Sequence, residues 1–484
     1  MTKNHSYIKN DFPKVYIKTF GCQMNEYDSE TMAGLLENSG YHLTDNPAEA
    51  GVILLNTCYV REKVKHKIYS RLGELKKLKE EKPELILGLC GCLVQKEPEE
   101  VLQRAPYLDF ILGTSNFYQL PEVLKEISEN DNQENELTPS PLPLPTGERI
   151  EVRGKRKFAY YQVRKRCTRI VRVEENRAIP EGMPKLRKRR FSAFVSVMRG
   201  CNNFCSYCNV PYVRGREASR PRKDILREIE ELAQKGYKEV TLLGQNVNSY
   251  GKGEKEKIDF ADLLVLVNQV ENLRRVRFTT SHPKDLSDKL IEKMAELDKV
   301  CEHLHLPVQS GSNKILSRMK RGYTREHYKN LVNKLRQAIP EIALTTDIIV
   351  GFPGEEEKDF QDTLELVEIV GFDGAFTFCY SPLKGTEAVR LKERIPEKIS
   401  GQRLRRLIEL QQKILLKKNE SLVGKEIEIM VEKISKKSSD ELQGRTRTNK
   451  IVVFKGRKKL IGNIISVKIV TPGCWALRGK VNSC

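Results

Sequence analysis

The sequence contains no long hydrophobic run and no apolar leader. No stretch among its 484 residues approaches the ~20 apolar residues that a membrane-spanning helix needs, so we expect no membrane segment. The N-terminal segment MTKNHSYIKNDFPK has neither an apolar core nor a small-residue cleavage site, and it predicts no secretory signal. A charged fraction of 31% and a mean hydropathy of −0.51 are typical of a soluble globular chain. We therefore expect a cytoplasmic protein.

The positive charge of the chain is unevenly placed. Lys and Arg number 85 against 65 Asp and Glu, which gives a formal net charge of +20. Residues 1–129 carry a net charge of −3, whereas 153–190 carry +12 and 417–484 carry +10. Because Lys and Arg that neutralise phosphates drive nucleic-acid binding, the two basic segments predict a polyanionic partner. A basic surface that serves only solubility is the alternative.

The hydrophobic pattern predicts an α/β chain that ends in a small β domain. Apolar runs alternate with helical patterns over 13–128, which predicts an open parallel sheet with helices. Six further runs of this kind within 187–417 predict a partial (β/α)6 barrel, whose site would lie at the carboxyl ends of its strands. Between them, 129–186 has the composition of a Pro-rich and then basic linker or insertion. The short β-type runs of 420–484 predict a small antiparallel barrel with a basic surface.

One tight group stands out among the twelve cysteines. Cys201, Cys205 and Cys208 form a C-x3-C-x2-C loop directly after the first predicted strand of the partial barrel. Three thiolates on one loop can bind three irons of a cubane cluster and leave the fourth iron open. A structural zinc site usually has four protein ligands, and no fourth Cys or His lies nearby in the sequence. The loop therefore predicts an iron–sulfur cluster.

Three more cysteines follow successive predicted strands of the first domain. Cys22, Cys58 and Cys92 each come directly after such a strand, and the carboxyl ends of parallel strands share one crevice. Spacing alone leaves two readings, a second cluster or buried structural cysteines. Cys90 competes with Cys92, because residues two apart on a strand face the same side. We assign Cys92, since it follows the glycine that ends the strand.

The C-x3-C-x2-C loop resembles the signature of the radical S-adenosylmethionine (SAM) enzymes. The resemblance implies a [4Fe–4S] cluster at Cys201, Cys205 and Cys208, whose open iron chelates SAM and whose electron cleaves it to a 5′-deoxyadenosyl radical. The superfamily usually places groups that contact the methionyl amine of SAM at the end of the second barrel strand. Gln245 and Asn246, in LLGQN, match that place, with a simple strand-end turn as the alternative.

A second candidate for SAM contact is the segment GFPGE, which ends the fifth barrel strand. Its Gly351 and Gly354 permit close backbone approach to a ligand, although a strand-to-helix turn alone also explains them. His303 and His305 lie on one face of the fourth predicted strand. We expect these two histidines to be core or lining residues rather than metal ligands.

The whole chain except about 129–168 resembles the methylthiotransferase family of radical-SAM enzymes. Cys22 in GCQMN, Cys58 in NTC and Cys92 in GC, together with the radical-SAM loop and the basic tail, carry the resemblance. It implies a second [4Fe–4S] cluster at these three cysteines, a radical-SAM core and a C-terminal RNA-binding TRAM domain. The segments TFGCQMNEYDSE, MRGCNNFCSYCNVPYVRGRE and DIIVGFPGE are most similar to the MiaB-type branch.

That branch implies an activity on tRNA. Its members methylthiolate C2 of N6-(dimethylallyl)adenosine at position 37 in two SAM-dependent steps, which implies the tRNA anticodon stem-loop as partner and an electron donor such as flavodoxin or ferredoxin. We expect a monomer. Alternative substrates are threonylcarbamoyladenosine in tRNA and ribosomal protein S12, and the basic tail favours RNA over protein. A non-catalytic RNA-binding iron–sulfur protein is the alternative from another class.

Two features depart from the family or refine the prediction. Asn209 follows the last cysteine of the loop, where relatives usually carry an apolar residue, and the Pro-rich stretch of 129–157 resembles an insertion. Charge in that insertion is therefore weaker support for RNA binding than charge in the tail. Within the tail, the basic runs Arg445–Lys450 and Lys455–Lys459 predict a surface that binds phosphates without reading sequence.

Overall fold

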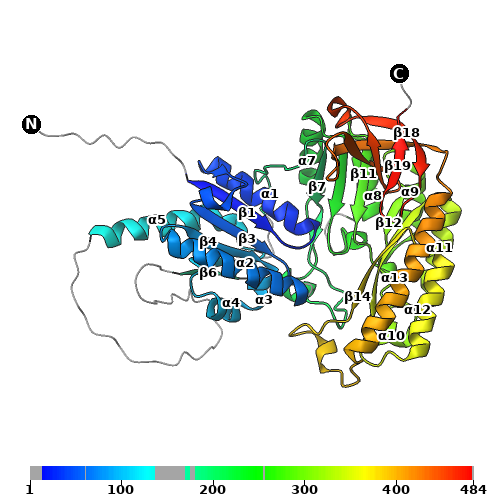
Figure 1. Ribbon diagram of the computed structural model, residues 1–484, viewed down its shortest axis with the longest axis horizontal. Coiled ribbons are helices and arrows are strands. Elements are labelled where there is room, and N and C mark those ends of the chain that lie inside the picture. The colour runs from blue at the N-terminus through cyan, green and yellow to red at the C-terminus, as the bar shows by residue number, and fades with distance from the viewer. Residues whose placement is uncertain (1–12, 60–61, 137–168, 175–179, 254–256, 482–484) are drawn as a thin grey trace, which may run out of the picture. The chain divides into compact units, whose positions relative to one another are not determined.

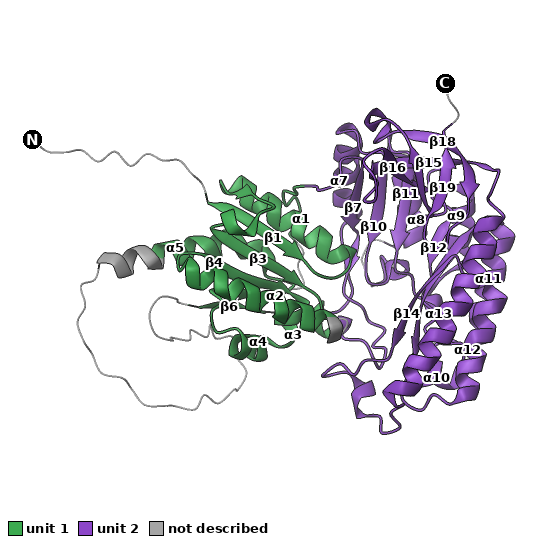
Figure 2. Ribbon diagram, viewed as in Figure 1, with its two compact units in different colours: residues 1–186, 212–214 green, residues 187–211, 215–484 purple. Residues whose placement is uncertain are grey.

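The chain forms two compact units, which Figure 2 shows in separate colours. The first contains residues 1–186 and 212–214, and the second contains 187–211 and 215–484. The computed structural model describes residues 13–59, 62–136, 169–174, 180–253 and 257–481. The Pro-rich part of the predicted linker, 137–157, lies outside these ranges. Within them, no helix combines the length and the apolar character needed to cross a membrane.

The first unit is built on a six-stranded sheet in the order β2-β1-β3-β4-β5-β6 (Figure 1). All its pairings are parallel. Its strands are β1 (Lys14–Thr19), β2 (His42–Leu43), β3 (Val52–Thr57), β4 (Ile86–Gly91), β5 (Phe110–Leu112) and β6 (Ile170–Arg172). Its helices are α1 (Gln23–Asn38), α2 (Glu62–Glu81), α3 (Cys92–Lys96), α4 (Pro98–Arg104) and α5 (Leu120–Glu136). Every residue of β3 is buried, as expected for a central parallel strand covered on both faces.

The connections of this sheet create a crevice next to β1. The chain passes from β1 to β2 on one side and then returns to β3 on the other side of β1. In open α/β sheets, ligands bind outside the carboxyl ends of the strands where the strand order reverses in this way. The predicted parallel α/β sheet is confirmed, and its topology places a ligand site at the ends of β1 and β3.

The boundary of the first unit differs from the prediction. The segment 129–186 was expected to be linker, yet β6 lies within it and pairs with β5 at the sheet edge. Further along the same segment, the backbone N–H of Leu186 bonds to the carbonyl of Glu30 in α1 at 2.9 Å. The apolar residues Ile170 and Val171 are too few to separate from the surrounding basic run by pattern, and only pairing with β5 gives them a strand conformation.

The second unit contains the partial (β/α)6 barrel. Its six parallel strands form two sheets, in the orders β11-β10-β7 and β12-β13-β14, and a parallel bridge from Val276 to Val300 lies between them. Both sheets and the surrounding helices contribute to one continuous hydrophobic core. The strands are β7 (Ser192–Ser196), β10 (Glu239–Leu243), β11 (Arg275–Thr279), β12 (His303–His305), β13 (Ala343–Val350) and β14 (Gly374–Cys379). The predicted architecture of this part is confirmed.

Amphipathic helices alternate with these strands and cover the outside of the barrel (Figure 1). Their starts follow ordinary capping rules: the hydroxyl of Thr324, for example, accepts the backbone N–H of His327. The helices are α7 (Arg222–Gln234), α8 (Phe260–Asn268), α9 (Asp288–Glu296), α10 (Asn313–Arg318), α11 (Arg325–Ala338), α12 (Glu357–Val370) and α13 (Glu397–Glu420). Two short strands, β8 (Met198–Arg199) and β9 (Ala218–Ser219), and the short helix α6 (Val210–Val213) flank the cysteine loop.

The C-terminal strands close into a five-stranded barrel in the order β15-β16-β17-β19-β18. They are β15 (Glu426–Ile434), β16 (Glu441–Thr446), β17 (Ile451–Lys455), β18 (Ile464–Thr471) and β19 (Leu477–Lys480). The predicted small barrel is confirmed, with one difference: β17 and β19 pair in parallel. A closed ring with an odd number of strands cannot alternate direction throughout, so one parallel pair is unavoidable.

Candidate active site

The C-x3-C-x2-C loop begins at the carboxyl end of β7, where a barrel of this kind carries its site. Gly200, directly before the first cysteine, has a φ of +77°, and a Cβ there would lie 2.0 Å from the carbonyl oxygen of Arg216. The loop is closed by backbone bonds from Cys201 to Gly215 at 3.2 Å and from Cys208 to Cys205 at 2.9 Å. The sequence RGC therefore places the first thiol against a tightly packed turn.

All three sulfurs of this loop accept N–H groups. The backbone N–H groups of Asn203 and Val210 point to the sulfurs of Cys201 and Cys208, at 3.5 and 3.4 Å. Burial raises the pKa of Cys201 to about 11 and that of Cys208 to about 12, and the neighbouring Cys205 raises both further. Close thiols with N–H donors fit the three ligands of an iron–sulfur cluster, since such donors stabilise the charge on the sulfurs.

A single metal ion fits this loop less well. Across the ranges described above, no three His, Cys, Asp or Glu side chains converge closely enough to hold one ion. A cubane cluster spaces its ligating sulfurs more widely, because each sulfur binds a different iron. Three thiols on one loop, each with an N–H donor, therefore fit the predicted cluster.

Sequence reasoning missed a buried arginine beside this loop. Arg321, in the connection between α10 and α11, donates from Nη1 to the sulfur of Cys205 at 3.4 Å. Its other bonds reach the hydroxyl of Tyr323 at 3.0 Å and the carbonyl of Pro307 at 2.8 Å, and the hydroxyl of Tyr207 lies 3.5 Å from Nη1. Arg321 is the donor in each of these bonds, so its charge stays fixed next to the cysteine loop.

Gln245 and Asn246 hold the strand ends together in the structure. The side-chain oxygen of Gln245 accepts the backbone N–H of Gly200 at 2.6 Å and so braces the cysteine loop. Asn246 is buried, accepts the N–H of His282 at 3.1 Å and donates to Asp285 at 2.7 Å. Both side chains lie at the predicted place, and their bonds are to protein atoms.

The two glycines of GFPGE are also accounted for by local packing. Gly351 and Gly354 have φ values of +70° and +81°, which favour glycine. A Cβ on Gly351 would lie 2.1 Å from the hydroxyl of Ser400, and one on Gly354 would lie 1.6 Å from the Arg318 guanidinium. The backbone N–H of Gly351 also bonds to the buried carboxylate of Glu355 at 2.7 Å. The strand-to-helix turn, which the sequence left as the alternative, is therefore a sufficient reason for both glycines.

Polar atoms that the sequence did not single out gather at the ends of the barrel strands. Within the described ranges, the side-chain atoms Ser281 Oγ, His282 Nε2 and Gln309 Oε1 are buried and have no hydrogen-bond partner. Thr280 and Gln309 adopt positive φ values of +67° and +71°, which are unfavourable for these residue types. Strain and unsatisfied polar groups of this kind gather at ligand sites. The strand ends therefore fit a polar ligand such as SAM.

His282 connects these strand ends to the cysteine loop. Its ring lies 5.7 Å from that of Tyr323, which bonds to Arg321. Burial, helped by Arg321 and two nearby lysines, lowers the pKa of His282 to about 2. The ring is therefore neutral at physiological pH and offers its free nitrogen as a neutral hydrogen-bonding group.

His303 and His305 line the barrel interior. His303 Nε2 and His305 Nδ1 each lie 3.1 Å from the hydroxyl of Thr345, and His305 Nε2 lies 3.5 Å from the Asp347 carboxylate. His303 is also 3.3 Å from the amide nitrogen of Asn449. Both are lining residues with protein partners, in agreement with the sequence analysis.

Cys22, Cys58 and Cys92 lie at the carboxyl ends of β1, β3 and β4, which are adjacent strands. A Cβ on Gly21 would lie 2.7 Å from the Cβ of Cys58, so the β1 loop packs directly on the β3 loop. Gly91 has a φ of +99°, and a Cβ there would lie 2.5 Å from the carbonyl oxygen of Thr57. These glycines bring the three thiol-bearing turns together at the crevice of the sheet.

Cys90 and Cys92 belong to different environments. Cys90 is the fifth residue of β4 and packs in the core on one face of the sheet, with Val15 and Met32. Cys92 begins α3 and belongs to the core on the other face. The sequence argument that both face one side fails because the positive φ of Gly91 ends the strand between them. Burial raises the pKa of both thiols, and Cys92 alone has Cys22 and Arg214 among the charges that act on it.

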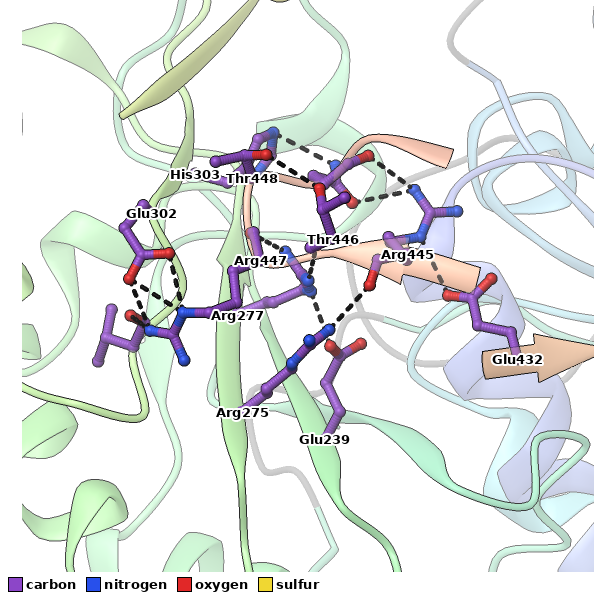
Figure 3. Close-up of polar contacts among 12 residues, drawn as sticks. Glu239, Arg275, Arg277, Glu302, His303, Glu432, Arg445, Thr446, Arg447 and Thr448 are labelled. Atoms are coloured by element: carbon purple, nitrogen blue, oxygen red, sulfur yellow. Dashed lines mark hydrogen bonds and ion pairs between the residues drawn. The ribbon is translucent and has the colours of Figure 1, made fainter. Parts of the chain in front are cut away.

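The C-terminal barrel docks on the beginnings of the partial-barrel strands through the turn between β16 and β17 (Figure 3). Arg277 is buried, pairs with Glu239 at 2.9 Å, and donates to the carbonyls of Thr446 and Arg447 at 2.7 and 2.8 Å. The guanidinium of Arg447 pairs with Glu302 at 2.7 Å. Glu239 begins β10, Arg277 is the third residue of β11 and Glu302 directly precedes β12, whereas the cysteine loop follows the carboxyl end of β7.

This docking corrects one prediction from the sequence. The basic run Arg445–Lys450 was expected to bind phosphates, yet its side chains pair within the chain: Arg445 with Glu432 and Lys450 with Asp373, both at 3.0 Å. Charge counts alone cannot distinguish a cation that faces solvent from one whose carboxylate partner is distant in the sequence. The run is therefore part of an intramolecular interface.

Three family models match the chain. The Radical SAM superfamily matches residues 195–367, the Uncharacterized protein family UPF0004 matches 14–113, and the TRAM domain matches 420–481. Among solved structures, the radical S-adenosylmethionine methyltransferase TsrM from Kitasatospora setae is similar with a TM-score of 0.52 and 13% identity, over 75% of this chain and 72% of that one. The cobalamin-dependent SAM radical enzyme OxsB is similar with a TM-score of 0.51 and 14% identity, over 84% and 56%. These structures support the fold.

Curated relatives match over nearly the full length. The tRNA-2-methylthio-N(6)-dimethylallyladenosine synthase of Moorella thermoacetica is 48% identical over 467 residues, which cover 96% of this chain and 97% of the relative. The protein of the same name from Clostridium perfringens strain SM101 is 47% identical, with 96% and 97% covered. The partial barrel and its cysteine loop place the chain in the class of radical-SAM proteins. Within that class, the chain belongs to the family of tRNA-2-methylthio-N(6)-dimethylallyladenosine synthases.

Proposed function

We propose that this chain methylthiolates C2 of N6-(dimethylallyl)adenosine at position 37 of tRNA and gives 2-methylthio-N6-(dimethylallyl)adenosine. The observation that carries the proposal is the near-full-length identity of about half to synthases of that name, with both cysteine triplets at strand ends. The enzyme is a radical-SAM tRNA methylthiotransferase. Its reaction attaches a methylthio group to C2 of adenine, a ring carbon whose only substituent is hydrogen. Radical chemistry is needed to break that unactivated C–H bond.

Two [4Fe–4S] clusters and SAM are the cofactors in this proposal. Cys201, Cys205 and Cys208 hold the cluster that binds SAM, and the second cluster is held at the turns after β1, β3 and β4 by Cys22, Cys58 and Cys92. When bound, these groups supply the electron that cleaves one SAM and the sulfur that a second SAM methylates. The polar strand ends of the partial barrel are the proposed SAM site.

The chain's own residues then position and protect the reactants. Gln245 braces the cysteine loop through Gly200, and Asn246 joins the ends of β10 and β11, so both act on the SAM site through the backbone. Arg321 fixes a positive charge next to Cys205. Gly351 and Gly354 shape the turn after β13, at the carboxyl end of the strand where SAM is proposed to bind. Such fixed groups exclude water from the radical and hold the base in place.

The tRNA is held, in this proposal, by the exposed basic run Lys455–Lys459 of the C-terminal barrel. Its four cations are exposed, and none of them forms an ion pair with a residue that the structure describes. Such side chains can contact phosphates and fix the orientation of the RNA without reading its sequence. The anticodon loop then presents its unpaired base to the cleft, since unstacked loop bases are accessible to proteins. A flavodoxin- or ferredoxin-type donor, a monomeric state and a cytoplasmic location complete the proposal.

The proposal is tested by nucleoside mass spectrometry of tRNA from a host that lacks its own synthase. Expression of this chain should convert N6-(dimethylallyl)adenosine to its 2-methylthio form, and a Cys201→Ala variant expressed at the same level should not. Threonylcarbamoyladenosine and ribosomal protein S12 from the same cells are measured in parallel. Methylthiolation of either of these without any change in N6-(dimethylallyl)adenosine would refute the proposed substrate.

A further inference from the structure

Arg214 lies buried among the residues around the second cysteine triplet. Its Nη2 donates to the carboxylate of Asp28 at 2.8 Å and to the side-chain oxygen of Asn25 at 3.3 Å, and its side chain is only 6% exposed. The same oxygen of Asn25 is 3.4 Å from the sulfur of Cys22, whose thiol donates to it. A buried cation is therefore linked to a predicted cluster ligand through one shared amide.

Three consecutive residues place Arg214 in this position. Residues 212–214 follow Cys208 of the other triplet by only a few positions, yet they belong to the first compact unit. Val213 lies in the same hydrophobic core as Cys92, and its carbonyl accepts the hydroxyl of Thr114 at 2.5 Å. The segment is therefore anchored through both the side chain and the backbone of Val213, which fixes the backbone from which Arg214 reaches Asp28 and Asn25.

A structural ion pair with Asp28 is the simplest alternative reading of Arg214. An ion pair alone does not require the cation to bond as well to the amide oxygen that accepts the Cys22 thiol. Three thiolates around a cubane give the site a net negative charge, and hydrogen bonds to sulfur and local charge set the stability and reduction potential of such clusters. A planar guanidinium has several N–H donors, so it can satisfy Asp28, Asn25 and a sulfur at once.

We infer that Arg214 is a positioning residue of the second cluster: held by Asp28, its guanidinium fixes the Asn25 side chain beside Cys22 and places a positive charge next to the negatively charged site. This inference rests on the proposed ligands Cys22, Cys58 and Cys92. It predicts that residues 212–214, which follow Cys208 in the sequence and belong to the first unit, contribute an essential cation to the site of the second cluster.

The test uses the full-length Cys201→Ala/Cys205→Ala/Cys208→Ala variant, reconstituted anaerobically, in which the second cluster is the only one expected. Iron and sulfide per chain and the midpoint potential by electron paramagnetic resonance are measured in this background. Arg214→Lys keeps the positive charge but replaces the planar guanidinium, with its several N–H donors, by a single ammonium group. The pair Asp28→Asn/Arg214→Gln removes both charges and so avoids an isolated buried carboxylate. Arg321→Lys is the matched control, because Arg321 is buried beside the other triplet.

In the parent we expect about four irons per chain, as one cubane requires. The charge-removing pair should lose at least half of this iron, and the iron that remains should reduce at a more negative potential. Arg214→Lys should keep most of the iron with a smaller negative shift, and Arg321→Lys should match the parent. A purely structural role would lower the melting temperature of the variants without moving the potential.

Two results would overturn the inference. If the charge-removing pair keeps the parent's iron content and midpoint potential, Arg214 has no role at the cluster. If the parent itself binds no iron, the proposed ligand set is wrong and the role of Arg214 falls with it. The first result leaves the proposed second cluster intact, so the two failures are distinguishable.

Discussion

Replacement of Arg277 by Ala should release the C-terminal barrel from the partial barrel. In the native structure the Arg277 guanidinium satisfies the carboxylate of Glu239 and two carbonyls of the β16–β17 turn, at 2.7 to 2.9 Å. Arg277 and Glu239 have side chains that are 7% and 5% exposed. Truncation of Arg277 would leave a buried carboxylate and two carbonyl oxygens without their donor.

The size of the effect follows from these contacts. Removal of one partner of a buried ion pair costs roughly 3–5 kcal/mol, mainly because the remaining charge is left uncompensated. Each buried carbonyl left without a hydrogen-bond donor adds a cost of about 1–3 kcal/mol. Water that enters the space left by Arg277 reduces this second cost. We therefore expect the docked turn to lose roughly 3–5 kcal/mol of protection against opening. Because about 1.4 kcal/mol corresponds to a tenfold change in an equilibrium constant, amide exchange in the turn should accelerate by roughly 100-fold or more.

Hydrogen-exchange mass spectrometry of peptides that contain the β16–β17 turn provides the measurement. The matched control is Arg274→Ala: Arg274 is exposed and three positions away, and surface changes of this kind usually stay within about 0.5 kcal/mol. The pair Glu239→Gln/Arg277→Met, which removes both charges, should fall between the two. An acceleration of less than threefold in Arg277→Ala, or one equal to that of Arg274→Ala, would refute the proposed docking.

Three further predictions concern the clusters and the tRNA surface. Replacement of all three cysteines of the C-x3-C-x2-C loop by Ala should reduce the iron content from about eight to about four per chain and abolish SAM cleavage, and retention of eight irons would contradict the ligand assignment. Cys92→Ala should stop methylthiolation while SAM cleavage persists, whereas Cys90→Ala should keep the auxiliary-cluster absorbance, and the opposite pattern would exchange their roles. Charge reversal of the four cations in Lys455–Lys459 should weaken tRNA binding and lower the slope of log affinity against log salt by up to about 3.6, at about 0.9 per phosphate contact, with SAM cleavage and iron content unchanged. An unchanged slope in a folded variant would exclude that run from the tRNA surface.

The layout of the fold was predictable because its signals are local. Parallel strands covered on both faces give continuous apolar runs such as VILLNT in β3, and amphipathic helices follow each of them. The exceptions are elements whose conformation depends on a distant partner. β6 contains three residues in a basic run and becomes a strand only by pairing with β5. Likewise, the sequence does not distinguish Arg447 from the other basic residues of the tail. Its ion pair with Glu302, 145 positions away, is visible only in the structure.

The same distinction applies to the candidate site. The spacing of the C-x3-C-x2-C loop identifies three thiols because they lie within eight residues, and the strand-end rule brings Cys22, Cys58 and Cys92 to one crevice. The two arginines beside these triplets carry no comparable signal. Arg321 contacts Cys205 across 116 positions, and Arg214 contacts Asp28 across 186. Buried cations of this kind are recognised only when the fold shows which sulfurs they face.

The second unit places the C-terminal barrel and the cysteine loop at opposite ends of the partial-barrel strands. The C-terminal barrel docks where β10, β11 and β12 begin, while the cysteine loop and the unsatisfied polar groups lie where the partial-barrel strands end. A five-residue strand such as β10 spans roughly 17 Å at about 3.3 Å per residue, so a single nucleotide cannot contact both ends. A substrate that contacts both ends must be an extended polyanion, which a folded tRNA is and a free nucleoside is not.

The cations of Arg445–Lys450 form ion pairs within the chain. The remaining exposed run Lys455–Lys459 can therefore be altered without changing either the docking interface or the cluster ligands. In the proposed function, binding of the tRNA body and hydrogen abstraction from its base therefore belong to separate parts of this unit that can be mutated independently.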